Sequence, residues 1–283
     1  RHEGAVAWRL GRVMPMNIRS IAERLTRRWS YRRRLPLSVG GAPIVVTPAA
    51  GLKYLIRPMA VIDPPLLRNV RELVRPGDTV WDIGANVGLF AFSAAALSGV
   101  GGQVFAFEPD LWLAQLLRRS QVMQPPSNSP VTIIPAGVGA AVALRRFHIS
   151  SRSRAANALA GHGSTQFGEV LEEQTIPVFT LDWLLENVAA PNVVKCDVEG
   201  AEVEVFANQR KVLKTCRPIV VCEVSPNSAG SMTDLFHSNA YRLFDGEKPL
   251  SGAGELERAA WNTIAIPEES IVKYVAAPSA RSE

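Results

Sequence analysis

Cysteine is scarce in this chain: its 283 residues include three, Cys196, Cys216 and Cys222. An odd number of cysteines, at spacings that fit neither a disulfide framework nor a zinc site, excludes a small domain held together by disulfides or zinc. We therefore expect all three to be small buried side chains of a protein from a reducing compartment.

The chain also lacks a convincing membrane-spanning segment. Residues 83–107 carry no charge over a length that could span a bilayer, but Asn86, Gln103 and several glycines interrupt them. That composition favours the loop, buried helix, loop and strand of a β-α-β unit. Because no secretory signal with an apolar core is visible near the first residue, we expect a cytoplasmic location.

Positive charge is concentrated in one segment. The net charge is +5, and between residues 17 and 34 seven arginines accompany a single glutamate. The apolar residues there fall near a helical stripe, which predicts a basic amphipathic helix over residues 17–31. A solvated helix is the first interpretation of this arm. The second is binding to an anionic membrane at its inner face through Arg19–Arg34, where Trp29 and Tyr31 suit lipid headgroups. Nucleic acid is not an expected partner.

Length and composition predict one large α/β domain with an N-terminal extension. Hydrophobic residues make up 47% of the chain and charged residues 20%, which is typical of globular proteins. We assign residues 1–60 to the extension, with a small hairpin whose strands are residues 44–46 and 54–56. Residues 61–283 form the main domain, into which a hairpin and a polar loop are inserted at about residues 144–179.

Apolar strands alternate with helical patterns along the main domain. Seven strands are predicted, at residues 79–83, 103–107, 131–135, 193–198, 218–224, 241–244 and 261–266. Helices are predicted at residues 64–74, 87–97, 111–122, 180–187 and 201–213. This alternation predicts an α/β fold of Rossmann-like type, with a central, mostly parallel seven-stranded sheet and helices on both faces.

A glycine-containing turn follows the first of these strands. The run from Asp82 to Gly88 (Asp-Ile-Gly-Ala-Asn-Val-Gly) stands where the strand gives way to a helix. Glycine there lets the backbone approach a ligand, and the start of the helix offers free amides. Twenty residues beyond Gly88, Glu108 ends the second strand, where a carboxylate can accept hydrogen bonds from both hydroxyls of a ribose. Together these features predict a nucleoside ligand.

The spacing of the glycines indicates which nucleoside this is. Enzymes that bind a dinucleotide carry Gly-x-Gly-x-x-Gly and use the start of the helix for a pyrophosphate. This chain has Gly-x-Asn-x-Gly instead, and Asp82 would repel a pyrophosphate. An acid at this position suits the ammonium group of S-adenosylmethionine, bound directly or through water.

Charged residues end the fourth predicted strand. Because side chains alternate along a strand, Lys195, Asp197 and Glu199 are expected on one face. Buried charges need partners or a ligand, and ligands of open α/β sheets bind at the carboxyl ends of the strands. We therefore expect Asp197 and Glu199 to lie in a binding site.

Four motifs resemble those of the FkbM-type methyltransferases. They are Asp82-Ile-Gly-Ala-Asn86-Val-Gly88, Phe107-Glu-Pro-Asp110, Thr180-Leu-Asp182 and Lys195-Cys-Asp-Val-Glu-Gly-Ala-Glu202, in the family's order. The resemblance covers about residues 76–224 and leaves out the arginine-rich arm. It implies a class I methyltransferase fold, S-adenosylmethionine as donor, and methylation of a hydroxyl on a sugar, glycan, lipid-linked saccharide or secondary metabolite.

The predicted cofactor-binding residues lie in these motifs and at the strand ends. They are Asp82, Gly84, Ala85, Asn86, Gly88, Glu108, Pro109, Gly137 and Asp197. Trp81 and Cys196 stand where the family has smaller or aliphatic residues. We expect these two departures to change only packing.

A hydroxyl is a poor nucleophile at neutral pH, and a positioned base contributes about 10²–10⁴-fold. Asp197 is the first candidate, Glu199 and Glu223 are the others, and His148 on the inserted hairpin is an outside candidate. The simpler interpretation is an ion pair between Lys195 and Glu199, with His148 an ordinary surface residue. The three acids could instead bind a divalent cation, but no dense oxygen cluster reinforces this, and we predict no metal site.

Two other function classes stay open. One is an oxidoreductase that uses an NAD-type cofactor, which the glycine spacing opposes. The other is a non-catalytic adaptor at a membrane or nucleic acid that retains the pocket. Asp63-Pro64-Pro65 is similar to the catalytic turn of nucleic-acid amino-methyltransferases, but Leu66 replaces the aromatic that stacks on a flipped base. We interpret the turn as a helix start and expect a small molecule or glycan as acceptor.

Overall fold

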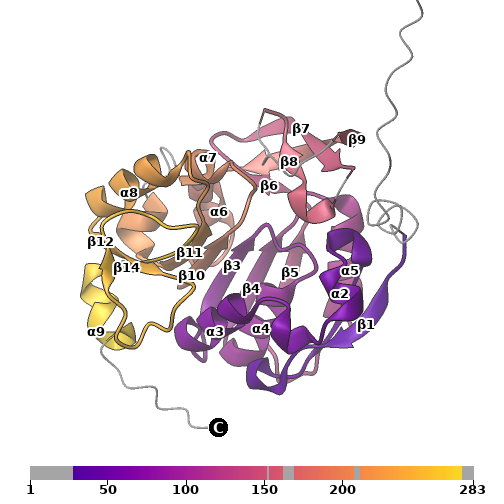
Figure 1. Ribbon diagram of the computed structural model, residues 1–283, viewed down its shortest axis with the longest axis horizontal. Helices are drawn as coiled ribbons and strands as arrows, with labels where there is room; N and C mark the ends of the chain where they lie inside the picture. Colours follow the sequence, from indigo (N-terminus) through magenta and orange to yellow (C-terminus); the bar gives the residue numbers. More distant parts are fainter. Residues whose placement is uncertain (1–27, 152, 162–168, 207–210, 276–283) are drawn as a thin grey trace, which may run out of the picture.

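The computed structural model describes residues 28–151, 153–161, 169–206 and 211–275. Its largest element is an eight-stranded sheet with the strand order β13-β12-β14-β11-β10-β3-β4-β5 (Figure 1). The strands are β3 (Thr79–Ile83), β4 (Gln103–Phe107), β5 (Val131–Ile134), β10 (Val193–Cys196), β11 (Ile219–Glu223), β12 (Tyr241–Asp245), β13 (Glu255–Leu256) and β14 (Asn262–Pro267).

The five strands from β11 to β5 in this order run parallel, whereas β14 is antiparallel to both β11 and β12. All seven predicted strands are present, and the two-residue strand β13 is the eighth. The predicted α/β fold with a mostly parallel central sheet is therefore confirmed.

Helices cover both faces of this sheet. One layer contains α3 (Pro64–Leu73), α4 (Leu89–Ser98) and α5 (Leu111–Gln121), and the other contains α6 (Leu181–Asn187), α7 (Glu202–Phe206) and α8 (Ala229–Ser238). Successive side chains of a strand point to opposite faces. Val80 of β3 therefore packs against the first helix layer, and Trp81 packs against the second. The Trp81 indole is fully buried and donates to the Ala189 carbonyl at 3.0 Å.

Short helices connect these elements. They are the single turns η1 (Leu37–Val39), η2 (Pro48–Ala50), η3 (Met59–Val61), η4 (Arg154–Ala156) and η6 (Glu268–Ser270), the π-helical η5 (Val212–Cys216), and the α-helices α2 (Lys53–Ile56) and α9 (Ile271–Tyr274). Within the described ranges, none of the helices is both long and apolar enough to cross a bilayer.

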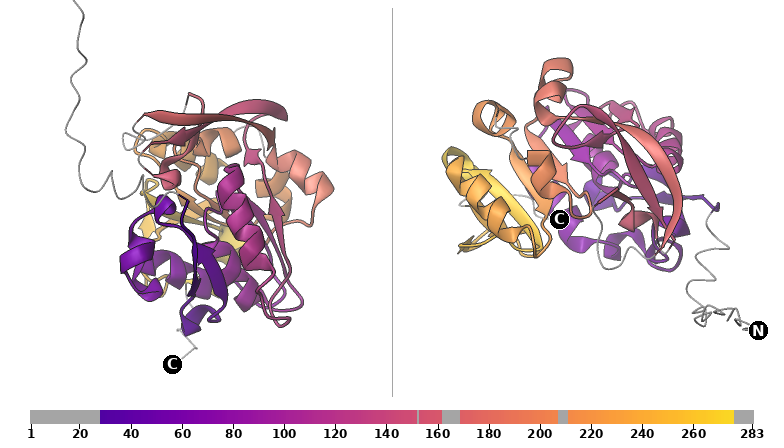
Figure 2. Two further views of the ribbon diagram at one scale, coloured as in Figure 1. Left: turned by 90° about the vertical axis from the view of Figure 1, so that its right-hand side faces the viewer. Right: turned by 90° about the horizontal axis from the view of Figure 1, so that it is seen from above.

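The inserted hairpin forms a sheet of its own. Strands β7 (Ala143–Ser150) and β9 (Val170–Phe179) pair antiparallel and are flanked by β8 (Ala158–Leu159) and β6 (Gly137–Val138). This inserted sheet lies across one end of the large sheet (Figure 2). Residues 152 and 162–168 of the predicted polar loop lie outside the described residues.

The predicted N-terminal hairpin is half correct. Its first strand is β2 (Pro43–Val46), but residues 54–56 belong to α2, where Tyr54 is buried. The partner of β2 is instead β1 (Tyr31–Arg34), in antiparallel register. The second predicted strand is therefore wrong. Packing explains the outcome: β2 lies against α5, and the Val45 amide donates to the Ser120 hydroxyl at 2.8 Å.

The predicted basic helix falls largely outside the described residues, which begin at residue 28. At its end, Tyr31 is in strand β1 and not in a helix. Arg33 turns inward from β1 and donates to the carbonyls of Tyr54 at 2.9 Å and Arg57 at 2.8 Å. This arginine therefore stabilises the fold locally, and membrane binding through Arg19–Arg34 stays a prediction.

Candidate active site

The turn after β3 requires glycine. Gly84 has a φ of 77°, and a Cβ atom there would lie 1.9 Å from the carbonyl oxygen of Asp197. The amides of Gly84 and Ala85 both donate to the Phe107 carbonyl at 3.0 Å. Gly88, the N-cap residue of α4, has a φ of 86°. The turn is thus fixed between the ends of β4 and β10, with no space for a side chain at Gly84.

Glu108 lies beside this turn at the end of β4. Its side chain is buried, and its two oxygens accept the amides of Asn86 at 2.7 Å and Asp110 at 2.8 Å. Burial, with the charge of Asp110, raises the pKa of Glu108 to about 8. Because each carboxylate oxygen has two lone pairs, both oxygens can still accept a hydrogen bond from a ligand.

A cavity opens beside Glu108, and we call it the Glu108 cavity. The predicted cofactor residues that line it are Gly84, Asn86, Glu108, Pro109, Gly137 and Asp197. The inserted sheet contributes Phe147 and Leu159, and the segment before β8 contributes Arg154, Ala155 and Asn157. Sequence reasoning missed the latter three, since no motif marks them. The cavity therefore combines acidic side chains with an apolar wall.

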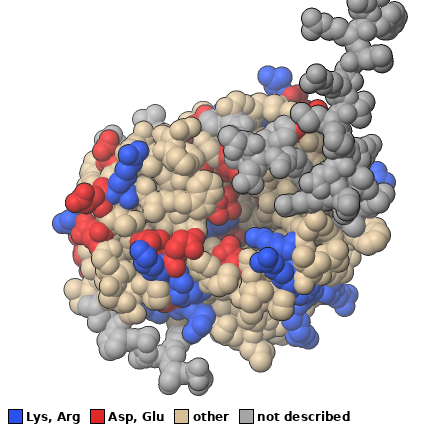
Figure 3. Space-filling model, viewed as in Figure 1, with Lys and Arg blue, Asp and Glu red and all other residues tan. Residues whose placement is uncertain are grey.

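A second cavity adjoins the first, and we call it the Glu223 cavity. Its charged residues are Lys53, Asp63, Lys195, Asp197, Glu199 and Glu223, and Ala85 also lines it. Asn86, Ala155, Asp197 and Glu199 border both cavities. Figure 3 shows a hollow near the middle of this face of the molecule, with acidic side chains gathered at it. The two cavities therefore meet at Asp197.

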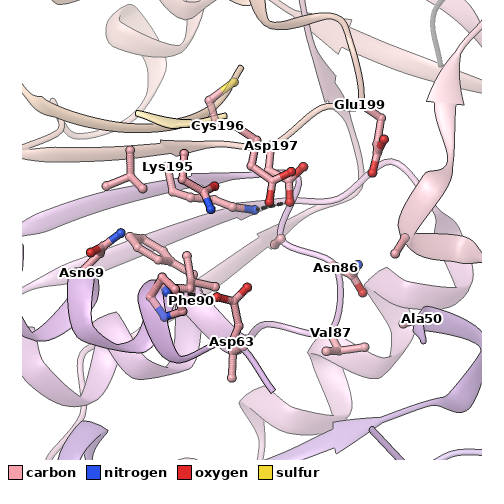
Figure 4. A pocket seen from close by; sticks show the side chains of 18 of the residues that line it. Ala50, Asp63, Asn69, Asn86, Val87, Phe90, Lys195, Cys196, Asp197 and Glu199 are labelled. Carbon is pink, nitrogen blue, oxygen red and sulfur yellow. Dashed lines mark hydrogen bonds and ion pairs between the residues drawn. The ribbon is translucent and has the colours of Figure 1, made fainter. Parts of the chain in front are cut away.

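Lys195 connects the charged residues beneath the turn. Its Nζ donates to the Gly84 carbonyl at 2.6 Å and lies 3.3 Å from Asp82 Oδ1. It also lies 3.5 Å from Asp197 Oδ2, and Figure 4 shows this pair. Burial opposes the lysine charge, but the carboxylates of Asp82 and Asp197 raise its pKa on balance. Lys195 therefore stays charged and holds the glycine turn against β10.

The structure places two predicted cofactor residues behind the cavity wall. Asp82 is fully buried and faces Lys195, and neither Asp82 nor Gly88 is among the described residues that line the two cavities. Asp82 thus acts on the turn through Lys195. Gly88 packs within the core, where a Cβ atom would lie 2.5 Å from the ring of Phe92.

The prediction that Lys195, Asp197 and Glu199 share a strand face is wrong for Glu199. Strand β10 ends at Cys196, and Glu199 has a φ of 50° in the turn that precedes α7. Strand alternation therefore does not place its side chain. Glu199 nevertheless borders both cavities, and Lys195 pairs with Asp82 and Asp197.

Two further acids reach the Glu223 cavity from different elements. Burial and the charge of Asp197 raise the pKa of Glu223 to about 8. Asp63 caps α3, accepting the Leu66 amide at 3.1 Å, and this confirms the predicted helix start. Burial also raises the pKa of Asp63. Figure 4 shows Asp63 facing Lys195 and Asp197 across the cavity.

Other candidates lie elsewhere. His148 Nε2 is 3.1 Å from Glu173 across β7 and β9, and His148 is not among the described residues that line either cavity. Cys196 and Cys222 are buried neighbours on β10 and β11, and Cys216 is half-buried. Within the described part of the chain, no group of three or more His, Cys, Asp or Glu residues is placed to hold a metal ion.

The chain matches a known family and several known proteins. A family model described as the methyltransferase FkbM domain matches residues 82–243. The hexuronic acid methyltransferase AglP of Haloferax volcanii is 29% identical over 158 residues, which cover 55% of this chain and 60% of AglP. The chain thus spans about three fifths of the length of this relative.

Two solved structures are similar at lower identity. Methyltransferase FkbM from Methylobacillus flagellatus KT is 16% identical with a TM-score of 0.43, over 70% of this chain and 49% of that chain. Precorrin-6y C5,15-methyltransferase from Geobacter metallireducens GS-15 is 15% identical with a TM-score of 0.42, over 75% of this chain and 91% of that chain.

Proposed function

Because the chain belongs to the FkbM methyltransferase family, we propose that it transfers a methyl group to a hydroxyl of a sugar, a glycan, a lipid-linked saccharide or a secondary metabolite. As a member of that family it is a methyltransferase with S-adenosylmethionine as methyl donor, which overturns the alternative of an NAD-type oxidoreductase. A sugar is favoured among the acceptors because the relative AglP is a hexuronic acid methyltransferase.

The observation that carries this proposal is that two cavities meet at Asp197. We assign the Glu108 cavity to S-adenosylmethionine. Glu108 would accept hydrogen bonds from the ribose hydroxyls, as acids at the end of a second strand do for nucleosides. The amino-acid end of the cofactor would lie toward the Gly84 turn, with Pro109 and Gly137 at the nucleoside end.

The Glu223 cavity is then the acceptor site. Its carboxyl groups and lysines can form hydrogen bonds with several hydroxyls of a sugar. In the reaction the bond between sulfur and the methyl carbon breaks while the acceptor oxygen bonds that carbon, which produces S-adenosylhomocysteine. Fixing the acceptor at the border of the cavities aligns the reacting atoms, and this alignment supplies much of the acceleration.

We propose Asp197 as the base that takes the hydroxyl proton. It borders both cavities, where the methyl group must cross, and Lys195 stands 3.5 Å away. Glu223 is a less suitable base at neutral pH because a pKa of about 8 keeps it mostly protonated. A protonated Glu223 can instead donate a hydrogen bond to the acceptor. Glu199, at the same border, is the third member of the proposed catalytic group.

The proposal is tested with S-adenosylmethionine labelled in its methyl group and a panel of sugars that includes glucose and glucuronic acid. We expect label in a product that is stable to alkali, because a methyl ether resists hydrolysis whereas a methyl ester of a uronic acid does not. Label that is released by alkali, or that is bound to nitrogen, would overturn hydroxyl methylation.

The base is tested with the variant Asp197→Asn and an exposed control, Asp234→Asn. At saturating cofactor, we expect Asp197→Asn to lower kcat by about 10²–10⁴-fold and the control to leave it unchanged. A kcat within about threefold of the unmodified enzyme would remove Asp197 from this role.

A further inference from the structure

Asp110 connects the Glu108 cavity to the inserted sheet. Its amide donates to Glu108, and its fully buried carboxylate caps α5 by accepting the Trp112 amide at 2.9 Å. The second carboxylate oxygen accepts the guanidinium of Arg154 and, at 2.8 Å, the side-chain amide of Asn157. One residue thus contacts the proposed ribose-binding acid and two side chains of the insertion.

The inserted segment held in this way forms a wall of both cavities. Arg154, Ala155 and Asn157 line the Glu108 cavity, and Ala155 also lines the Glu223 cavity. The segment has further attachments, since the Ser153 hydroxyl donates to the Ala49 carbonyl at 3.3 Å and Asn157 accepts the amide of Ser150 at 2.8 Å. Its position against the body of the protein therefore decides how closed the first cavity is.

We propose that Asp110, Arg154 and Asn157 form a clamp that closes the inserted sheet over S-adenosylmethionine, with Arg154 as a positioning residue that sets cofactor affinity. This inference rests on the assignment of the Glu108 cavity to the cofactor. The Arg154 side chain is only 10% exposed and that of Asp110 is fully buried. Removing one partner of a buried ion pair leaves an uncompensated charge, which disfavours the closed arrangement.

The clamp predicts a specific kinetic signature. If the cofactor binds only the closed arrangement, its apparent affinity is reduced by the fraction of protein molecules that are closed without ligand. A saturating concentration of cofactor then returns nearly all molecules to the closed arrangement. Loss of the clamp should therefore raise the KM for S-adenosylmethionine and leave kcat nearly unchanged. A residue that served only to stabilise the fold would instead lower the unfolding temperature without this split between KM and kcat.

The test is calorimetric titration of the full chain with S-adenosylhomocysteine. We expect Arg154→Ala to raise Kd at least about tenfold and the KM for S-adenosylmethionine in parallel, with kcat within about threefold. Arg154→Lys should recover part of the affinity, because it keeps the charge. Arg146→Ala is the matched control, because this arginine of the same insertion pairs with the exposed Glu173 at 3.7 Å. The Kd of this variant for S-adenosylhomocysteine should equal that of the unmodified protein.

A second variant keeps the proposal falsifiable if Arg154→Ala does not fold. Asp110→Asn retains an oxygen that can cap α5 and removes the charge that faces Arg154, so Kd should again rise. An unchanged Kd in Arg154→Ala would overturn the clamp. If only Asp110→Asn folds, an unchanged Kd in that variant would do so. A variant that lowers kcat and leaves Kd unchanged would also overturn it. Glu108→Gln separates the two proposals: unchanged affinity in this variant means that the cavity assignment itself has failed.

Discussion

Replacing Glu108 by glutamine should weaken cofactor binding in a manner that depends on pH. The carboxylate already accepts the amides of Asn86 and Asp110, one at each oxygen. The side-chain nitrogen of glutamine cannot accept a hydrogen bond, so one of the two backbone amides loses its acceptor. The glutamine oxygen is neutral, and it forms a weaker hydrogen bond with a ribose hydroxyl than a carboxylate oxygen does. The variant therefore loses charge-assisted hydrogen bonds and disturbs the turn that begins at Gly84.

The magnitude follows from the hydrogen bonds and from the pKa of Glu108. Two bonds from ribose hydroxyls to a carboxylate are worth about 3 kcal/mol together, or roughly 150-fold in Kd. Because the pKa of free Glu108 is about 8, ionising it at pH 7 costs about 1.4 kcal/mol. The expected loss is thus about 15-fold at pH 7 and approaches 150-fold at about pH 9.

Calorimetric titration with S-adenosylhomocysteine at the two pH values measures both losses. The ratio of the variant's Kd to that of the unmodified protein cancels any titration of the ligand. Glu186→Gln, at an exposed position on α6, controls for the loss of a carboxylate. If Glu108→Gln binds within about twofold of the unmodified protein at pH 9, the cofactor does not use this carboxylate.

Three other perturbations test the packing and electrostatics of the site. Gly84→Ala should abolish binding of S-adenosylhomocysteine and lower the free energy of unfolding by at least about 2 kcal/mol. The reason is that Gly84 has a φ of 77° and the new Cβ would meet the Asp197 carbonyl. A variant as stable as the unmodified protein in urea would contradict this. Lys195→Met should cost about 3–5 kcal/mol in the same assay by leaving the buried Asp82 without its cation, and a loss below about 1 kcal/mol would exclude a structural ion pair. Without ligand, the free energy of unfolding should fall as the pH rises from about 5 to 8. Burial raises the pKa of Glu108 and Glu223 to about 8, so over this interval the folded state holds more protons than the unfolded chain. A free energy of unfolding that rises over this interval in urea titrations would contradict the buried carboxyl groups.

The central sheet could be predicted from the sequence because its strands are short apolar runs bounded by turn residues and helices. The N-terminal hairpin could not. Residues 54–56 are β-prone, yet they lie in α2 with Tyr54 buried, because tertiary packing overrides local strand preference. The pairing of β1 with β2 closes over residues 35–42, a connection much longer than the two-residue turns that mark a hairpin in a sequence.

The candidate site was predictable where strands deliver its residues. Glu108, Asp197 and Glu223 end or follow three of the parallel strands, β4, β10 and β11, whose carboxyl ends lie at one edge of the sheet. Asp63 was interpreted only as part of a helix start, and Arg154, in the insertion, was not singled out, yet both line the cavities. Their approach depends on how separate elements pack together, which neither periodicity nor motif spacing encodes.

A crystal structure of the protein with bound S-adenosylhomocysteine tests the central claim most directly. We expect the ribose hydroxyls within hydrogen-bond distance of Glu108 and the sulfur atom at the border of the two cavities, directed toward Asp197. A nucleoside bound elsewhere, or one whose ribose makes no contact with Glu108, would contradict the assignment of the cavity and the mechanism built on it.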